Sequence, residues 1–370
     1  ETAATRVDED GLVNYAEILG DSVLTGNNSN FDTGIGSWLG YNGGTLAHST
    51  DKLQVTLTAG TSGAKINTNS LISGGQSGKT FKVRAKIWQG TTNDTSFWVY
   101  IGGVQQSITI SSTPTYFEVE LTASNSAGLF IYNSGVSDEV TYFIDDVTLK
   151  EVTRDNVPRI DYTGGGCPHI LAEPERTNLS NNNLSTWGVT NATRVLNDTT
   201  SPDGTNDGVK ITATSTSQPR TETGAYDGVP VIDTTYTFSV FVKKGNTPYI
   251  ALSRFSGSQN AVFNLDTKSI VTSNAENATI EEISNGWFKI SITQTVLSTD
   301  VYNLWKVNLT NGTSYTVGVV GEYVYIWGAQ IEVGSYATSY IPTSGSTVTR
   351  NEDIFTRDGI GSLIGQSEGT

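Results

Sequence analysis

The chain has 370 residues, of which 22 are Lys or Arg and 37 are Asp or Glu, for a net charge of −15. This length allows two or three domains with sizeable cores. The acidic balance argues against binding to nucleic acid or to anionic membranes, because both rely on basic patches. One cysteine, Cys167, excludes an internal disulfide framework. No stretch has the pattern of a membrane span or a signal peptide, so no membrane insertion is expected.

The first half of the chain is typical of strands and turns. Residues 1–19 are polar and irregular, and we expect a connector there. From 20 to 152, short alternating runs are separated by Gly, Asn and Ser clusters, which predicts one β-sandwich module. These runs are Leu53–Leu57, Phe81–Trp88, Phe97–Ile101, Tyr116–Leu121, Leu129–Tyr132 and Tyr142–Leu149.

The second half repeats this organisation. Residues 153–178 are rich in proline and glycine and predict a second connector. Residues 179–345 predict a second β-sandwich module with strands in a parallel order, a repeat of architecture rather than of residues. Residues 346–370 look like the start of a further, truncated domain, and the lack of methionine suggests a piece of a longer or processed protein. The predicted fold is therefore all-β: two tandem sandwich modules joined by irregular connectors.

The strand that closes the first module carries a carboxylate among apolar residues. Alternation places Asp145 on one side with Val147 and Leu149, so we expect Asp145 to point inward. A buried carboxylate needs a cation or several donors. If the first and last strands of the module lie side by side, Asp32 and Asp145 are placed to hold one structural Ca²⁺, an ion that prefers oxygen ligands. The alternative is that Asp32 caps a turn and Asp145 accepts backbone donors.

The same alternation predicts an aromatic face on the first module. One set of positions is core, and the opposite set collects aromatic and basic residues. These are Arg84, Lys86, Trp88, Trp98, Tyr100, Phe130 and Tyr132. Sugar rings stack on aromatic rings while charged and amide groups bond their hydroxyls. The face is therefore a candidate glycan platform, and packing against a neighbouring module or subunit is the alternative.

The sequence offers little for catalysis, and we expect no enzyme. Only His48 and His169 are present, and no Gly-x-Ser-x-Gly motif occurs. The carboxylate pairs Glu173/Glu175 and Glu281/Glu282 resemble the acid pairs of glycosidases only in composition. We interpret both pairs as solvated surface.

The segment Asn28-Ser29-Asn30-Phe31-Asp32-Thr33-Gly34, Trp38 and the closing Phe143-Ile144-Asp145-Asp146-Val147 resemble jelly-roll carbohydrate-binding modules found beside xylanases and glucanases. The resemblance implies a jelly-roll fold and carries the family's structural calcium onto Asp32 and Asp145. In the second module, Ile326-Trp327-Gly328-Ala329 takes the place of Ile144–Val147 and lacks the carboxylate. Calcium is therefore expected in the first module only.

The connectors resemble tail-fibre and other virion adhesin proteins of bacteriophages and prophages. The likeness lies in Ala4-Thr5-Arg6-Val7, Val157-Pro158-Arg159-Ile160-Asp161-Tyr162, Cys167-Pro168 and 171–178, and in Trp327-Gly328-Ala329-Gln330-Ile331-Glu332. It implies a non-enzymatic virion appendage, located on the virion or outside the cell, that binds bacterial surface polysaccharide. Partners would be further copies in a homo-oligomer, a trimer, or other virion proteins. An accessory region of a secreted polysaccharide-degrading enzyme and a structural spacer or filament subunit are the alternatives.

Overall fold

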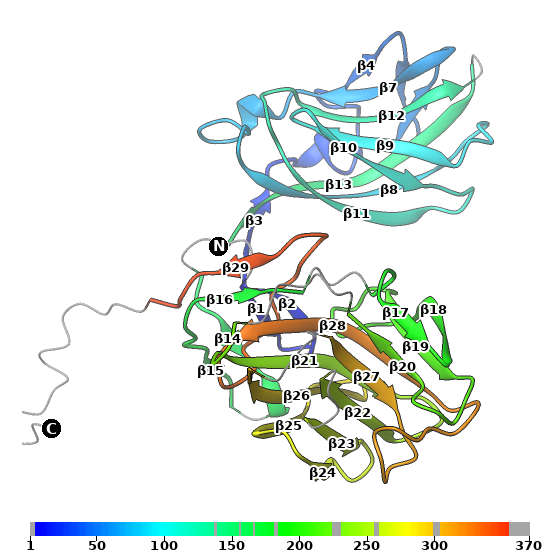
Figure 1. The fold of residues 1–370 in the computed structure, drawn as a ribbon. Helices are drawn as coiled ribbons and strands as arrows, with labels where there is room; N and C mark the ends of the chain where they lie inside the picture. The colour runs from blue at the N-terminus through cyan, green and yellow to red at the C-terminus, as the bar shows by residue number, and fades with distance from the viewer. Residues whose placement is uncertain are drawn as a thin grey trace, which may run out of the picture. The chain divides into compact units, whose positions relative to one another are not determined.

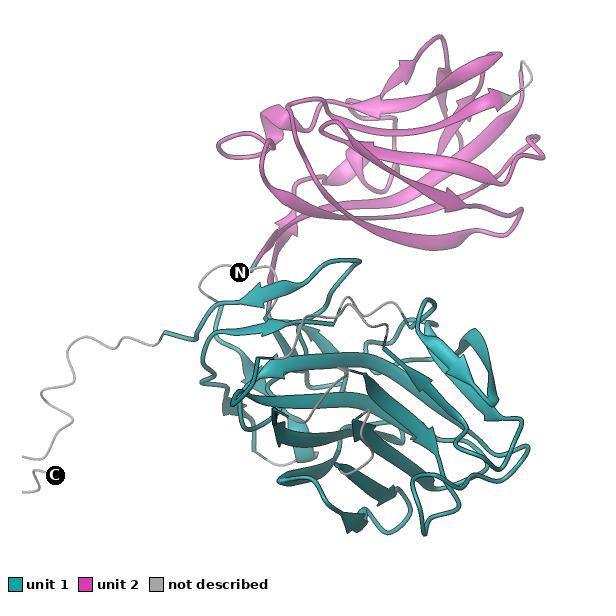
Figure 2. Cartoon of the chain, viewed as in Figure 1, with its two compact units in different colours: residues 1–16, 154–370 teal, residues 17–153 magenta. Residues whose placement is uncertain are grey.

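The computed structural model describes residues 4–136, 139–154, 157–165, 167–180, 184–223, 231–254, 259–298 and 304–354. The chain divides into two compact units, one of residues 17–153 and one of residues 1–16 with 154–370 (Figure 2). We call the first the inserted unit and the second the split unit, because the inserted unit interrupts it in the sequence. The described residues form β-strands and three short 3₁₀ turns, η1 (Gly26–Asn28), η2 (Asn69–Leu71) and η3 (Thr163–Gly165). Within them, no helix is long and apolar enough to cross a bilayer.

The inserted unit is a sandwich of two antiparallel sheets (Figure 1). The five-stranded sheet has the order β10 (Val104–Thr109), β9 (Ser96–Ile101), β12 (Leu129–Val136), β7 (Gly60–Ile66) and β4 (Leu39–Tyr41). The six-stranded sheet has the order β11 (Thr115–Thr122), β8 (Thr80–Gln89), β13 (Thr141–Thr153), β6 (Leu53–Thr56) and β5 (Thr45–His48), with β3 (Ile18–Ser22) also paired to β13.

The core of the inserted unit lies between these sheets. Every second residue of β8, Phe81, Val83, Ala85 and Ile87, is buried, as are Phe97, Val99 and Ile101 of β9. The intervening side chains face outward from their own sheet. This alternation is the pattern that the sequence predicted for a sandwich strand.

The split unit contains a second sandwich with the same strand order. One sheet runs β17 (Gly188–Thr190), β20 (Arg220–Glu222), β27 (Trp305–Leu309), β22 (Tyr249–Arg254), β23 (Asn260–Asn264) and β24 (Ser269–Ser273). The other runs β18 (Ala192–Thr199), β19 (Gly208–Ala213), β28 (Tyr323–Val333), β21 (Thr235–Lys244), β26 (Trp287–Thr295) and β25 (Asn277–Glu282). Taken in chain order, β17–β23 match β4–β10 and β26–β28 match β11–β13, and β24 and β25 are an addition. The fold is thus all-β with two tandem sandwiches, as predicted.

The connector segments carry short strands that belong to the split unit. β1 (Thr5–Val7) and β2 (Val13–Tyr15) form a hairpin, β14 (Ile160–Asp161) pairs with β15 (His169–Ile170), and β16 (Arg176–Asn178) pairs with β29 (Val348–Arg350). The hairpin adds Val7 and Val13 to an apolar cluster whose other members are Phe241, Trp287, Trp327 and Tyr340. It covers the outward rings of β21, β26 and β28. The further domain expected near the C-terminus falls mostly on residues 355–370, which lie outside the described residues.

Candidate functional site

The outer face of the five-stranded sheet gathers aromatic side chains from three strands. Trp98 and Tyr100 face outward from β9, because Phe97, Val99 and Ile101 fill the core. The β9–β12 register places Phe130 opposite Tyr100 and Tyr132 opposite Trp98. On the far side of β7, Tyr41 of β4 stands opposite Gly63. All five rings are half-buried and therefore reach solvent in part.

Four of the rings pack edge to face, and Trp98 stands opposite Tyr132 in the neighbouring strand. Tyr41 and Tyr100 meet opposite sides of Phe130, each with a centroid separation of 4.9 Å and interplanar angles of 84° and 82°. Tyr41 also lies 5.7 Å from Tyr132. Gly63 makes this contact possible, because a Cβ there would lie 2.6 Å from the Tyr132 Cα. Such edge-to-face pairs fix ring orientation in advance of any ligand.

Polar groups border the aromatic surface. The Tyr132 hydroxyl donates to Gln105 Oε1 from β10, and Lys65 of β7 lies opposite Phe130. Burial, followed by the neighbouring Tyr41 and Tyr100, raises the pKa of Tyr132. The phenol therefore stays protonated at neutral pH and remains a hydrogen-bond donor. The surface thus offers apolar ring faces with hydrogen-bonding groups at its edge.

The predicted platform residues do not share one face. Trp98, Tyr100 and Tyr132 lie together on the five-stranded sheet, whereas Arg84, Lys86 and Trp88 lie on the outer face of the six-stranded sheet. Since both sheets point their outward residues away from the common core, the two groups are on opposite sides of the sandwich. The prediction of a single face was wrong, because alternation separates inside from outside but does not assign a strand to a sheet.

The Trp88 side of the inserted unit forms its own contacts. Trp88 packs against Phe143 with centroids 5.4 Å apart, and the Arg84 guanidinium lies 3.5 Å from the Tyr116 ring centroid. Lys86 Nζ is 2.7 Å from an Asp146 carboxylate oxygen, which also accepts the Tyr116 hydroxyl. The two basic groups are therefore already engaged within the sheet.

Asp145 lies on the outer side of its sheet, opposite Lys86, and the expectation that it points inward was wrong. A β-bulge at Asp146, whose φ is 50°, shifts the alternation between Ile144 and Val147. Both of those residues are buried, and Asp145 between them is not. The extra residue of a bulge turns the following side chains to the other face.

The segment that carries Asp32 nevertheless lies beside the closing strand that carries Asp145. Ser29 pairs with Val147 through two hydrogen bonds, which bring the 29–32 turn to the bulge. Burial raises the pKa of Asp145, with the charges of Asp146 and Asp32 contributing in the same direction.

Oxygen atoms that could coordinate a cation lie near Asp32. Asn30 Nδ2 donates to Asp32, while Asn30 Oδ1 is buried and accepts no hydrogen bond. An orphaned amide oxygen next to the Asp32 carboxylate matches the oxygen ligands that Ca²⁺ prefers. In the described part of the chain, no three His, Cys, Asp or Glu side chains gather in a metal-binding arrangement. Any bound Ca²⁺ would therefore need amide, main-chain or water oxygens in addition.

Sequence reasoning missed three residues in particular. Tyr41 belongs to a strand of three residues, too short for its alternation to be noticed. Glu173, interpreted as solvated, is mostly buried between Arg159 and Arg350. Glu281, interpreted in the same way, is exposed but lines a cavity of the split unit. The sequence contained only a weak indication that Glu173 is buried. It consisted of two arginines and a carboxylate in segments that otherwise resemble linkers.

The face of the split unit that matches the aromatic surface is polar. On β20 and β27 its outward residues are Arg220, Glu222, Lys306 and Asn308. Arg220 Nε donates to Glu222 at 2.9 Å, and Lys306 lies 3.7 Å from the same carboxylate. The aromatic surface is thus a property of the first sandwich.

Comparisons with known proteins give structural neighbours only. No protein-family model matches the sequence, and no curated protein matches it. The fold is similar to the N-terminal CBM22-1–CBM22-2 tandem domain of Paenibacillus barcinonensis Xyn10C, at 12% identity over 87% of this chain and 100% of that chain, with a TM-score of 0.32. It is also similar to the N-terminal cellulose-binding domain of Cellulomonas fimi β-1,4-glucanase C, at 24% identity over 33% of this chain and 92% of that chain, with a TM-score of 0.25. TM-scores this low do not define a function.

Proposed function

We propose that the chain is a non-enzymatic virion appendage, of the tail- or head-fibre kind, whose inserted unit binds bacterial surface polysaccharide. The observation that carries the glycan part is the aromatic surface of the five-stranded sheet. Its rings are Tyr41, Trp98, Tyr100, Phe130 and Tyr132. The sequence likeness of the connectors to phage adhesins supports the virion part.

The physical argument rests on what these rings do at a water-facing sheet. The opposite sides of the strands already fill the core, so the rings are not needed there. An aromatic surface that reaches solvent is costly unless a ligand covers it. The C–H faces of sugar rings stack on aromatic rings, and Gln105, Lys65 and the tyrosine hydroxyls are in position to bond hydroxyl groups. An extended sheet face suits a chain of sugars better than a single one.

The test compares the two sides of the inserted unit. Trp98→Ala and Tyr100→Ala should each weaken binding to bacterial capsular or lipopolysaccharide glycans by roughly tenfold or more, as for central aromatic anchors. Trp88→Ala, on the opposite sheet, is the matched control and should leave binding unchanged. Affinity is measured on a glycan array and by calorimetry with the full chain. Equal losses in all three variants, or no loss at Trp98 and Tyr100, would contradict the proposal.

Assembly distinguishes the proposal from its alternatives. Phage fibres and adhesins are expected to be oligomers, here a homotrimer, or to be attached to other virion proteins. An accessory region of a polysaccharide-degrading enzyme is expected to be a monomer. A spacer or filament subunit would bury the aromatic surface between copies. Light scattering separates the three. The mass distinguishes an oligomeric fibre protein from a monomeric accessory region. Only a spacer loses its self-association when Trp98 is replaced.

We also propose that the inserted unit holds one structural Ca²⁺ through Asp32 and Asp145, with Asn30 Oδ1 as a further ligand. The buried and unpartnered Asn30 oxygen supports the assignment. The ion would tie the 29–32 turn to the bulge of β13 and neutralise two nearby carboxylates. It would have no part in chemistry.

Chelation tests the calcium proposal. Millimolar EDTA should lower the melting temperature of the full chain by several degrees, as expected for loss of a ligand that binds only the folded state. Asp32→Asn and Asp145→Asn should abolish that shift, and Asp51→Asn, an exposed carboxylate elsewhere in the unit, should preserve it. A melting temperature that is indifferent to EDTA in the unaltered protein argues against the ion.

A further inference from the structure

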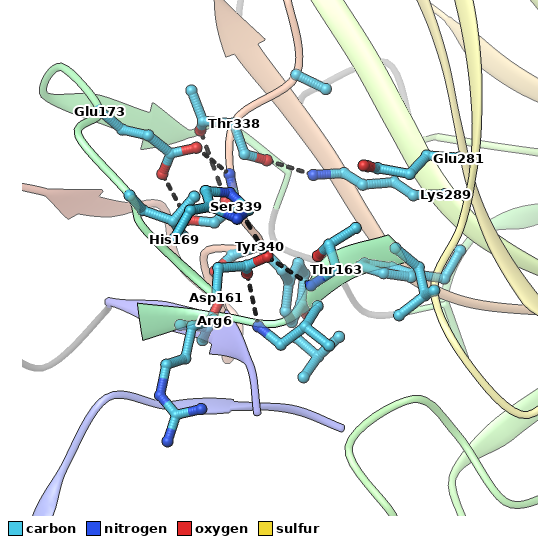
Figure 3. A pocket seen from close by; sticks show the side chains of 17 residues that line it. Arg6, Asp161, Thr163, His169, Glu173, Glu281, Lys289, Thr338, Ser339 and Tyr340 are labelled. Carbon is cyan, nitrogen blue, oxygen red and sulfur yellow. Dashed lines mark hydrogen bonds and ion pairs between the residues drawn. The ribbon is translucent and has the colours of Figure 1, made fainter. Parts of the chain in front are cut away.

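A cavity of about 260 Å³ lies within the split unit (Figure 3). Its wall is drawn from segments far apart in sequence: the β1–β2 hairpin, residues 161–173, β21, β25 to β26, and residues 337–340. Pockets with convergent polar groups on an apolar wall are the usual form of small-molecule sites. This volume is below the roughly 300 Å³ at which sites for drug-sized ligands begin, so the cavity suits one small ring rather than a chain of them.

Hydrogen bonds between the segments hold the wall in place. Arg159 donates to the main-chain oxygen of Thr5 at 3.1 Å, and Val7 N donates to Asp161 at 2.9 Å. Ser339 N donates to Glu173 at 2.8 Å. The cavity is therefore formed before any ligand arrives, which reduces the entropy lost on binding.

Two side chains of opposite charge face the cavity from adjacent strands. Glu281 of β25 stands directly opposite Lys289 of β26. Lys289 donates one hydrogen bond, to the main-chain oxygen of Thr338, and has two further protons to offer. Glu281 makes no hydrogen bond or ion pair with any described residue. A carboxylate acceptor and a lysine donor are thus left for a ligand.

The remaining wall combines apolar and hydroxyl groups with the polar side chains of Arg6, Asp161, His169 and Glu173. Val7, Val13, Phe241 and Tyr340 line one part of the cavity, and Thr163 adds a hydroxyl. A neutral, polyhydroxylated ring has the matching character, because it presents C–H faces together with hydroxyl groups that both donate and accept.

We propose that this cavity binds a single neutral monosaccharide, with Glu281 accepting from its hydroxyls and Lys289 donating to a hydroxyl or ring oxygen. The ring's C–H face packs on the apolar wall. This site is independent of the aromatic surface, because it belongs to the split unit and uses none of the same residues.

The experiment uses the full chain carrying Trp98→Ala and Tyr100→Ala, so that the aromatic surface does not contribute. Saturation-transfer NMR is recorded with the methyl glycosides of glucose, galactose, mannose and N-acetylglucosamine. At least one should bind with a millimolar Kd, the range expected for so small a ligand. Glu281→Ala should then weaken binding about tenfold or more, the usual loss for a charge-assisted hydrogen bond.

Glu282→Ala, the next residue of β25 and outside the cavity wall, is the matched control and should leave the Kd unchanged. An unchanged melting temperature of the Glu281 variant shows that folding is intact. The proposal is overturned if no glycoside gives a transfer signal, which indicates a cavity filled by water. It is equally overturned if both glutamate variants act alike, or if free glutamate or lysine binds more tightly than every glycoside.

Discussion

Arg159 and Arg350 both bind the carboxylate of Glu173, at 2.9 and 2.8 Å, and both arginines are almost completely buried. Ser339 adds two further hydrogen bonds to the same carboxylate. Asp353 pairs with Arg159 from beyond β29. One carboxylate thus joins the 157–173 connector, the loop after β28 and the C-terminal end of the described chain.

Replacing Glu173 tests this network at residue level. Although burial favours the protonated acid, Arg350, Ser339 and Arg159 outweigh it and hold the pKa of Glu173 below its usual range. Glu173→Gln should destabilise the split unit by roughly 3 kcal/mol at neutral pH, because it leaves buried guanidinium charge uncompensated. Urea unfolding at neutral pH measures the loss, and exposed Glu175→Gln is the control.

The pH dependence has a defined sign. A carboxylate whose pKa is lower in the folded state contributes stability above its unfolded pKa, about 4.3, and that contribution disappears as the pH falls through the lower folded value. The difference between the unaltered protein and Glu173→Gln should therefore be largest at neutral pH and shrink below about pH 4. A difference that is constant from pH 7 to pH 3 would contradict the role of the charge.

At the level of elements, the two sandwiches share a bulge in their last strand. In β13 the bulged residue is Asp146, and in β28 the register to β21 shifts at the matching Gly328, whose φ is 60°. The sequence match of Ile326–Ala329 to Ile144–Val147 therefore identified equivalent positions. Trp327 stands where Asp145 stands, and it packs against Phe241 and Tyr340 under the N-terminal hairpin.

Gly328→Ala tests the bulge. A Cβ at this position would lie 2.9 Å from the Phe241 ring. The alanine would also have to adopt the left-handed backbone conformation of Gly328. The expected loss is about 2–4 kcal/mol, the sum of backbone strain and overpacking. Gly321→Ala is the control, because its φ is 85° but nothing lies within 4 Å of the added Cβ. It should cost only about 1 kcal/mol, and equal losses by urea unfolding would show that packing at Gly328 does not matter.

These elements also show what the sequence can predict. Alternation identified the inward residues of β8 and β9 correctly, because core positions repeat every second residue. It failed for Asp145, since one bulged residue reverses the pattern. It also failed when it placed Trp88 and Trp98 on the same face, since a sandwich has two outer faces. The position of Glu173 depends on contacts with Arg350 and Asp353 from the other end of the split unit, and no local pattern contains that information.

At the scale of the whole molecule, each hydrophobic cluster consists of residues from one unit only. The segments that lead into and out of the inserted unit meet within the split unit, where Arg154 lies 4.3 Å from the Tyr15 ring. The split unit therefore has its own core and closely spaced ends at the point of insertion.

Excision tests this independence. Replacing residues 17–153 by a short Gly-Ser linker should leave the split unit folded, with a melting temperature within a few degrees of its value in the full chain. Residues 17–153 should fold alone. Circular dichroism and calorimetry measure both, and a cleaved but otherwise identical full chain is the control. Failure of the excised chain to unfold cooperatively would show that the units depend on each other.

The neighbouring positions of Tyr15 and Arg154 have a consequence for how such a chain changes over time. A domain whose two ends meet can be exchanged as a whole by recombination. The split unit, with its buried Arg159–Glu173–Arg350 network, is then kept unchanged. The ligand specificity of the inserted unit can then change in one recombination event, without intermediate sequences in which the split unit must fold again.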